Sequence, residues 1–132
     1  MPDQTFELSV PAHPDFVRIV RMVVAGIGNA MAMDVEQIDD LKTAVGEAYT
    51  MFHPSLESPL RVRTSCNDDE LSIEVIQQFE AGAPRLLAMD NSMERGLAIV
   101  LLNHLMDRVE YLSDAQHKRF KLTKFRRNGG AH

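Results

Sequence analysis

Residues 34–52 have the pattern of a long amphipathic helix, and we expect the rest of the chain to be organised around it. Its apolar residues recur at spacings of three and four, which places them on one face. They are Ile38, Leu41, Val45, Ala48, Tyr49 and Phe52. Asp34 occupies the expected N-cap position, and Gln37 three residues later completes a capping-box pattern. Pro54 is expected to end the helix.

Alternating apolar and polar residues predict strands around this helix. We expect strands at residues 5–10, 60–65, 71–76 and 119–125, a short strand around residues 109–111, and a hairpin turn at residues 67–69. A first helix is expected over residues 15–31. Its predicted apolar face comprises Phe16, Ile19, Val20, Val23, Val24 and Ile27. Residues 77–93 lack a period and predict a loop, whereas residues 97–106 are apolar nearly all round and predict a buried helix.

This order of elements predicts an α+β fold. Helices on one face of a mixed, mostly antiparallel sheet form a two-layer α/β sandwich. The 132 residues fit a single domain, 1–132, with residues 126–132 as a frayed tail.

Composition excludes several classes of protein. An apolar fraction of 45% and a charged fraction of 25% are typical of a globular protein, and no apolar run reaches the length that spans a bilayer. The first ten residues do not resemble a signal peptide. With one cysteine, Cys66, no internal disulfide or cysteine-based zinc site is expected, so a cytoplasmic location without membrane contact fits. The net charge of −5 argues against direct binding of nucleic acid.

Basic residues cluster near the C-terminal end of the chain. They are Lys118, Arg119, Lys121, Lys124, Arg126 and Arg127. One interpretation is a solvated edge strand and tail; the other is a basic docking surface.

Two stretches resemble the anti-sigma-factor serine kinases of RsbW and SpoIIAB type, which belong to the GHKL ATPase superfamily. Gly46-Glu47-Ala48-Tyr49-Thr50-Met51 is similar to the Ser-Glu-Ala-x-Thr-Asn box of that family. Glu94-Arg95-Gly96-Leu97-Ala98-Ile99, with the following LLNHLMDRVEY, is similar to its Glu-Gly-Gly-Leu-Gly-Leu box and Leu-Met-Asp-x-Val continuation. The resemblance extends over about residues 6–125. It implies the GHKL fold, and it assigns Glu47 the role of polarising the hydroxyl that attacks ATP.

The chain departs from the motifs that this resemblance implies for ATP and Mg²⁺. Met51 stands where the family asparagine holds Mg²⁺, and a thioether is a soft ligand. By strand register, Gln77 replaces the aspartate that receives adenine, and Phe79 replaces the glycine of the same motif. His117-Lys118-Arg119 replaces the Gly-Thr before the last strand.

The glycine-rich phosphate box is also eroded. Arg95 and Ala98 replace two of its glycines, and Gly96 is retained. Fewer glycines leave less room for backbone N–H groups to approach a phosphate. Glu47 then has two interpretations, a catalytic base or a helix-surface carboxylate.

Three functions follow from the resemblance and the departures. The first is an anti-sigma factor or partner-switching regulator of transcription, as in stress responses. It would bind a sigma factor, and an anti-anti-sigma protein of STAS type, as a homodimer without cofactor; Arg18 and Arg21 are its expected partner contacts. The second is an active serine kinase that uses ATP and Mg²⁺ through Glu47, Gln77, Arg95 and Gly96. The third is a GHKL-like dimeric module with a partner other than a sigma factor.

Overall fold

The computed structural model describes residues 3–52, 55–78, 92–114 and 116–127; of residues 55–58, 92, 94 and 95 it describes the backbone alone. The elements follow one another as β1 (Gln4–Ala12), a 3₁₀ turn η1 (Pro14–Phe16), α1 (Val17–Ala30), α2 (Val35–Thr50), β2 (Ser55–Cys66), β3 (Glu70–Gln78), α3 (Ser92–Leu105), β4 (Arg108–Ser113) and β5 (His117–Phe125). The strands form a five-stranded sheet in the order β1-β2-β3-β5-β4, and all four neighbouring pairs are antiparallel.

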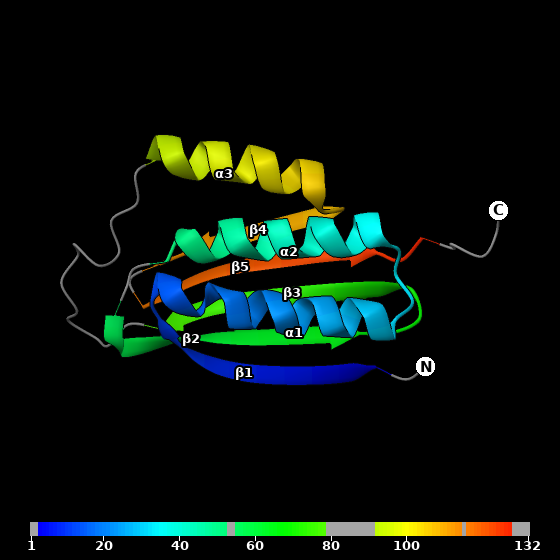
Figure 1. Ribbon diagram of the computed structural model, residues 1–132. Helices are drawn as coiled ribbons and strands as arrows, with labels where there is room; N and C mark the ends of the chain where they lie inside the picture. Colours follow the sequence, from blue (N-terminus) through cyan, green and yellow to red (C-terminus); the bar gives the residue numbers. More distant parts are fainter. Residues whose placement is uncertain (1–2, 53–54, 79–91, 115, 128–132) are drawn as a thin grey trace.

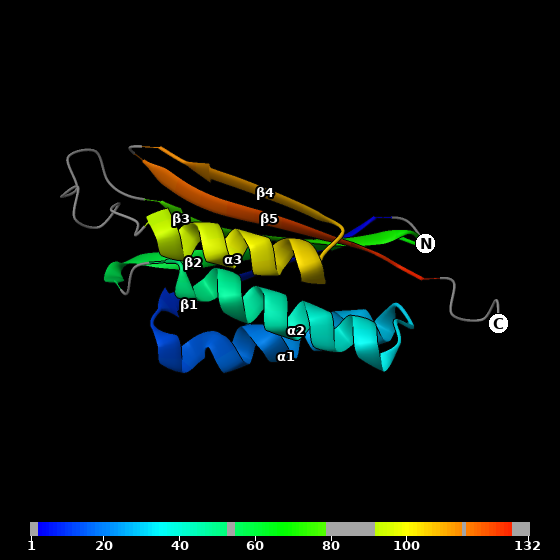
Figure 2. The same cartoon turned by 90° about the horizontal axis from the view of Figure 1, so that it is seen from above.

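The three helices lie side by side on one face of this sheet, as Figures 1 and 2 show. The predicted two-layer α+β architecture is therefore confirmed. Period-2 burial along β3 places Leu71, Ile73 and Val75 under the helices, where each is fully buried. None of the described helices is long and apolar enough to cross a membrane.

The amphipathic helix α2 forms as its sequence predicts. Asp34 accepts a hydrogen bond from the Gln37 backbone N–H at 2.8 Å, and the Gln37 side chain accepts one from the Asp34 N–H, which completes the capping box. Five of the six residues in the predicted stripe are buried, and Ile38 is partly buried. Gln37 Nε2 also donates to the backbone oxygen of Phe125, which joins the start of α2 to the end of β5.

Two predicted apolar faces are wrong in part. Phe16 and Ile19 are 37% and 44% exposed. The buried apolar residues of α1 are Val20, Val24 and Ile27, and Val17 and Val23 are partly buried against the core. The helix expected to be buried all round, α3, exposes Leu97 and Val100 by 67% and 58%, because α2 and the sheet cover only its opposite side.

The boundaries of the predicted loop also need correction. Gln77 and Gln78 continue β3, while Ser92 and Met93 open α3. The remainder of that prediction, residues 79–91, lies outside the described residues, as does Pro54. Of the predicted tail, residues 128–132 lie outside them as well, whereas Arg126 donates to the backbone oxygen of Asp68.

The interpretation of the basic cluster as a solvated edge strand is wrong for β5. This strand lies between β3 and β4, and Lys118 and Lys124 on its helix-facing side are 1% and 6% exposed. Arg119 and Lys121 point to the opposite, uncovered face of the sheet, where Arg119 lies 3.4 Å from Glu74. Cys66 is buried, as expected for a small apolar residue, and burial raises the pKa of its thiol.

Candidate functional site

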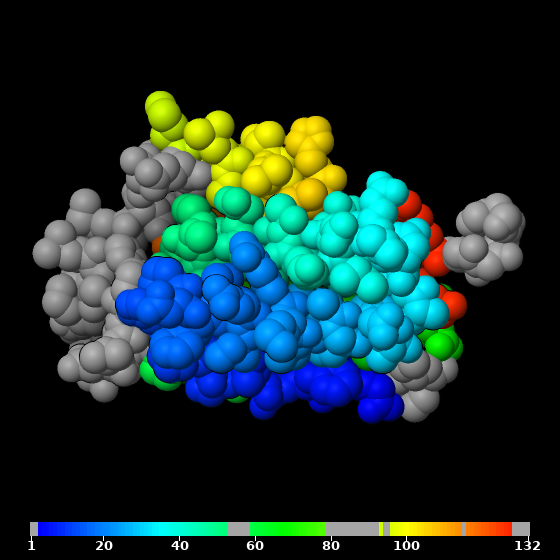
Figure 3. All heavy atoms as spheres, viewed as in Figure 1, coloured from blue at the N-terminus to red at the C-terminus, as the bar shows by residue number. Residues whose placement is uncertain are grey.

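Two hollows meet at Glu47 on the helical face of the molecule. One, of about 400 Å³, lies between α1 and α2 and is lined by Arg21, Asp39, Lys42, Thr43 and Glu47. The other, of about 390 Å³, lies between α2 and α3 and is lined by Glu47, Thr50, Met51, Leu97, Ala98 and Leu101. Figure 3 views this face, with α2 between the other two helices. Glu47 is the residue common to both hollows.

The Glu47 side chain is partly buried on α2 and makes no ion pair with any residue that the structure describes. Its neighbour Gly46 is buried under the Arg21 guanidinium, whose Nε would lie 2.8 Å from a Cβ at this position. The absence of a side chain at Gly46 therefore allows Arg21 to lie across α2. This arrangement places a cation in the hollow that Glu47 lines.

The metal position does not fit Mg²⁺. Met51 is the C-cap residue of α2 and offers a thioether, while the side-chain oxygen ligands that line the same hollow belong to Glu47 and Thr50. The Thr50 hydroxyl donates to the Glu47 backbone oxygen at 2.7 Å. Mg²⁺ needs oxygen ligands in near-octahedral geometry. Among the described residues, no group of three His, Cys, Asp or Glu side chains could hold a metal ion.

The predicted adenine end of the site is filled by protein. Gln77 and Lys118 are paired across β3 and β5 and are 0% and 1% exposed. The Lys118 ammonium donates to the backbone oxygen of Met51 at 2.5 Å and lies 5.8 Å from the centre of the Phe52 ring. Phe79, the other predicted residue here, lies outside the described residues. A buried ammonium therefore lies next to Gln77, the position at which the resemblance expects adenine to bind.

The predicted phosphate box lies in the first half of α3. Gly96 is exposed, and a Cβ built on it would meet nothing within 4 Å, while Ala98 is 7% exposed and lines the hollow beside Met51. The side chain of Arg95 is not among those described. In the described part of the box, no neighbouring group comes close enough to the Gly96 backbone to require a residue without a side chain.

The two predicted partner-binding arginines have different surroundings. Arg18 is exposed on α1 and forms no ion pair within the described ranges, whereas Arg21 lines the hollow between α1 and α2. The structure therefore brings Arg21 and Glu47 together and leaves Arg18 on the outer surface.

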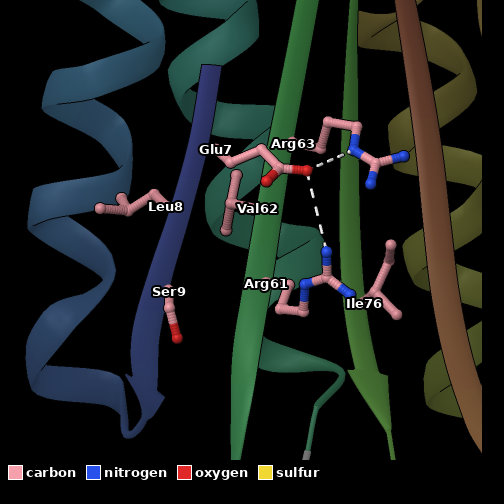
Figure 4. A pocket seen from close by; sticks show the side chains of 7 residues that line it. All are labelled: Glu7, Leu8, Ser9, Arg61, Val62, Arg63 and Ile76. Carbon is pink, nitrogen blue, oxygen red and sulfur yellow. Dashed lines mark hydrogen bonds and ion pairs between the residues drawn. The ribbon is translucent and has the colours of Figure 1, made fainter. Parts of the chain in front are cut away.

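A further hollow of about 230 Å³ lies on the sheet and is separate from all these positions. It is lined by Glu7, Leu8, Ser9, Arg61, Val62, Arg63 and Ile76 (Figure 4). Glu7 Oε1 lies 2.9 Å from Arg63 Nε and 3.8 Å from Arg61 Nη2, so this carboxylate already pairs with both arginines.

Sequence reasoning missed the role of Lys118, although a signal was present. Lys118, Phe120, Leu122 and Lys124 alternate with Arg119, Lys121 and Thr123, so the two lysines share the period-2 face of buried apolar residues.

Comparison with known proteins agrees with this fold. Residues 10–124 match the model of the histidine kinase-like ATPase domain family. The chain is 35% identical over 126 residues to a protein named serine-protein kinase RsbW from Halalkalibacterium halodurans, with 85% of this chain and 78% of that protein covered. It is 30% identical over 125 residues to the RsbW of Bacillus velezensis, with 83% and 78% covered.

A solved structure has the same fold. The crystal structure of the RsbU and RsbW domains of a Mycobacterium tuberculosis protein superimposes with a TM-score of 0.68 at 14% identity. The superposition covers 94% of this chain and 33% of that longer chain. Together, the family match and the sequence relatives place this chain in the histidine kinase-like ATPase domain family, as a member of its RsbW type.

Proposed function

We propose that this chain is an anti-sigma-type regulator that works by binding partner proteins, with nucleotide binding and kinase activity lost or weak. The partners are a sigma factor and an anti-anti-sigma protein of STAS type, bound by a cytoplasmic homodimer that needs no cofactor. The support is the membership of the RsbW type combined with a pocket whose residues do not fit ATP and Mg²⁺.

The outer face of α1 is the observation that carries this proposal. Phe16, Ile19 and Met22 recur every three residues and are 37%, 44% and 68% exposed. Arg18, on the same helix, is exposed and has no acidic partner in the part of the chain that the structure describes. An apolar strip beside an unpaired cation suits a partner surface that combines aliphatic and acidic side chains. Arg18 is accordingly the proposed contact, and Arg21 a neighbouring one.

Glu47 is the specific observation that favours the alternative, an active serine kinase. Its carboxylate is partly buried, unpaired among the described residues, and faces an open hollow. A general base must be free to accept a proton from the attacking hydroxyl. Phosphoryl transfer, however, relies mainly on positioning and on metal ions that neutralise charge. The Met51 side chain offers no oxygen ligand for a metal ion. Lys118 occupies the end of the site at which the base is expected to bind.

Charge reversal on α1 tests the proposal. Each sigma factor of the source organism would be purified and its binding to wild type, Arg18→Glu and Arg108→Glu measured by biolayer interferometry. Arg108 is an exposed arginine on β4, so both variants change the charge by the same amount on different surfaces. We expect one sigma factor to bind, Arg18→Glu to weaken it by at least about tenfold, and Arg108→Glu to leave it unchanged. Equal binding by all three proteins would refute the placement on α1.

Two further results would replace the proposal. Transfer of ³²P from ATP to the STAS-type protein, abolished in Glu47→Gln, would establish the kinase. Stable binding to a signalling protein, with no sigma factor bound by the wild type, would indicate the third function, a module with a different partner.

A further inference from the structure

Two buried lysines of β5 each donate a hydrogen bond to the C-terminus of a helix. Lys118 Nζ donates to the backbone oxygen of Met51, the C-cap of α2, at 2.5 Å. Lys124 Nζ donates to the backbone oxygen of Leu105, the last residue of α3, at 2.6 Å. The last carbonyl groups of a helix lack intrahelical partners and carry partial negative charge, so an ammonium stabilises them. Both lysines thus hold a helix end against the sheet.

The surroundings of the two lysines differ in a way that separates their roles. Lys124 also pairs with Asp40 of α2 at 3.0 Å, at the end of the sheet near the start of α2. Lys118 lies at the opposite end of β5, next to Gln77 in register and above the Phe52 ring. Gln77, Met51 and Lys118 are three of the positions at which the chain departs from the ATP-binding motifs. The structure brings buried Gln77 and Lys118 together with the backbone oxygen of Met51, whose side chain is partly buried.

We propose that the Lys118 side chain is the internal occupant of the nucleotide site: it closes the base end of the pocket and fixes the C-terminus of α2 to β5 without any ligand. This inference rests on the proposed function, because it supplies the reason why nucleotide binding is lost. It adds that Lys118, at one of the changed positions, excludes the base from this end of the pocket.

The physical argument is the cost of displacing this ammonium. Lys118 is 1% exposed, so a base could enter only if the side chain left its place. Leaving would break a short, charge-assisted hydrogen bond, and the Met51 oxygen would lose this donor. A shorter, uncharged side chain removes both the obstacle and this cost, whereas an uncharged side chain of similar length removes only the hydrogen bond.

Four proteins separate these effects: wild type, Lys118→Thr, Lys118→Met and Lys124→Met. Lys118→Thr opens the site, Lys118→Met removes the charge but keeps the volume, and Lys124→Met removes the matched lysine at the other end of β5. Circular dichroism and thermal unfolding without ligand would first establish that each variant folds. Calorimetric titration with ATP up to about 5 mM, with and without Mg²⁺, would then measure binding, and the ATP-induced shift of Tm gives a second readout.

We expect heat of binding and a raised Tm for Lys118→Thr alone, with Kd falling from above about 5 mM to below about 1 mM. If Lys118→Thr folds and neither it nor the wild type binds ATP, Lys118 is not the obstacle and this inference is overturned. The proposed loss of nucleotide binding would still stand. If the wild type itself binds ATP below 1 mM, both the inference and the proposed loss are overturned. If Lys118→Thr does not fold, Lys118→Ser and Lys118→Ala provide the same test.

Discussion

The two glycines of α1 should respond differently to alanine, because only Gly28 lies against another helix. Gly26 is exposed, and a Cβ added there would meet nothing within 4 Å. Gly28 is buried, and its Cβ would lie 3.1 Å from Leu41 Cδ1 and 3.3 Å from Ile38 Cγ1 of α2. Both contacts are tighter than ordinary van der Waals packing, so α2 would have to yield.

The magnitudes follow from two opposing effects. In a helix, alanine is favoured over glycine by about 1 kcal/mol, so Gly26→Ala should raise the free energy of unfolding by most of this amount. Gly28→Ala gains less, because it lies in the last turn, and it incurs an overpacking cost of about 1–3 kcal/mol. We therefore expect Gly26→Ala to raise Tm by about 3–5 °C and Gly28→Ala to leave it unchanged or lower it by up to about 8 °C.

Thermal and urea unfolding followed by circular dichroism would measure the Tm and the free energy of unfolding of both variants, with Gly26→Ala as the matched control. A double-mutant cycle of Gly28→Ala with Leu41→Ala adds a specific test, because removing the Leu41 side chain relieves the crowding. The two changes should show a favourable coupling of at least about 0.5 kcal/mol. If Gly28→Ala stabilised the protein as much as Gly26→Ala does, the close approach of α1 and α2 described here would be refuted.

Two other predictions concern polar contacts of α2. The Tyr49 hydroxyl donates to the backbone oxygens of Pro11 and His13 at 2.9 and 3.0 Å, so Tyr49→Phe should cost about 1 kcal/mol in urea unfolding. Burial raises the pKa of Tyr49 above its usual value of about 10, so the folded state holds the phenol proton more tightly than the unfolded state. The stability of the wild type should therefore fall above about pH 10 more steeply than that of Tyr49→Phe. Parallel pH profiles of the two proteins would contradict this. Asp34→Ala removes the N-cap bond to Gln37 and should lower the free energy of unfolding by about 1 kcal/mol, whereas Asp34→Asn, which can still cap, should lose much less.

The sequence was sufficient for the elements whose pattern is local. The capping box at Asp34 and the stripe of α2 depend on spacing within one helix, so both were predictable. The exposure of Leu97 and Val100 was not, because an apolar helix face says nothing about which neighbour covers it. The buried role of Lys118 was missed for a related reason. Its period-2 position indicated the buried face, but lysines are seldom buried. Only the pairing of β5 with β3 and its place beside α2 reveal its partner, the Met51 backbone oxygen.

The ties between β5 and α2 also bear on how the proposed partner surface is positioned. Lys118 holds the end of α2 and Lys124 pairs with Asp40 nearer its start, while the Phe125 backbone oxygen accepts from Gln37 in the first turn. α1 packs along α2, with Gly28 at a close contact. The outer face of α1 is therefore fixed to the sheet through α2 by contacts within the chain. A regulator built in this way would present its binding face whether or not nucleotide is present, so sigma-factor affinity should be unchanged by adding Mg-ATP or Mg-ADP, and a change of more than about threefold would contradict this reasoning.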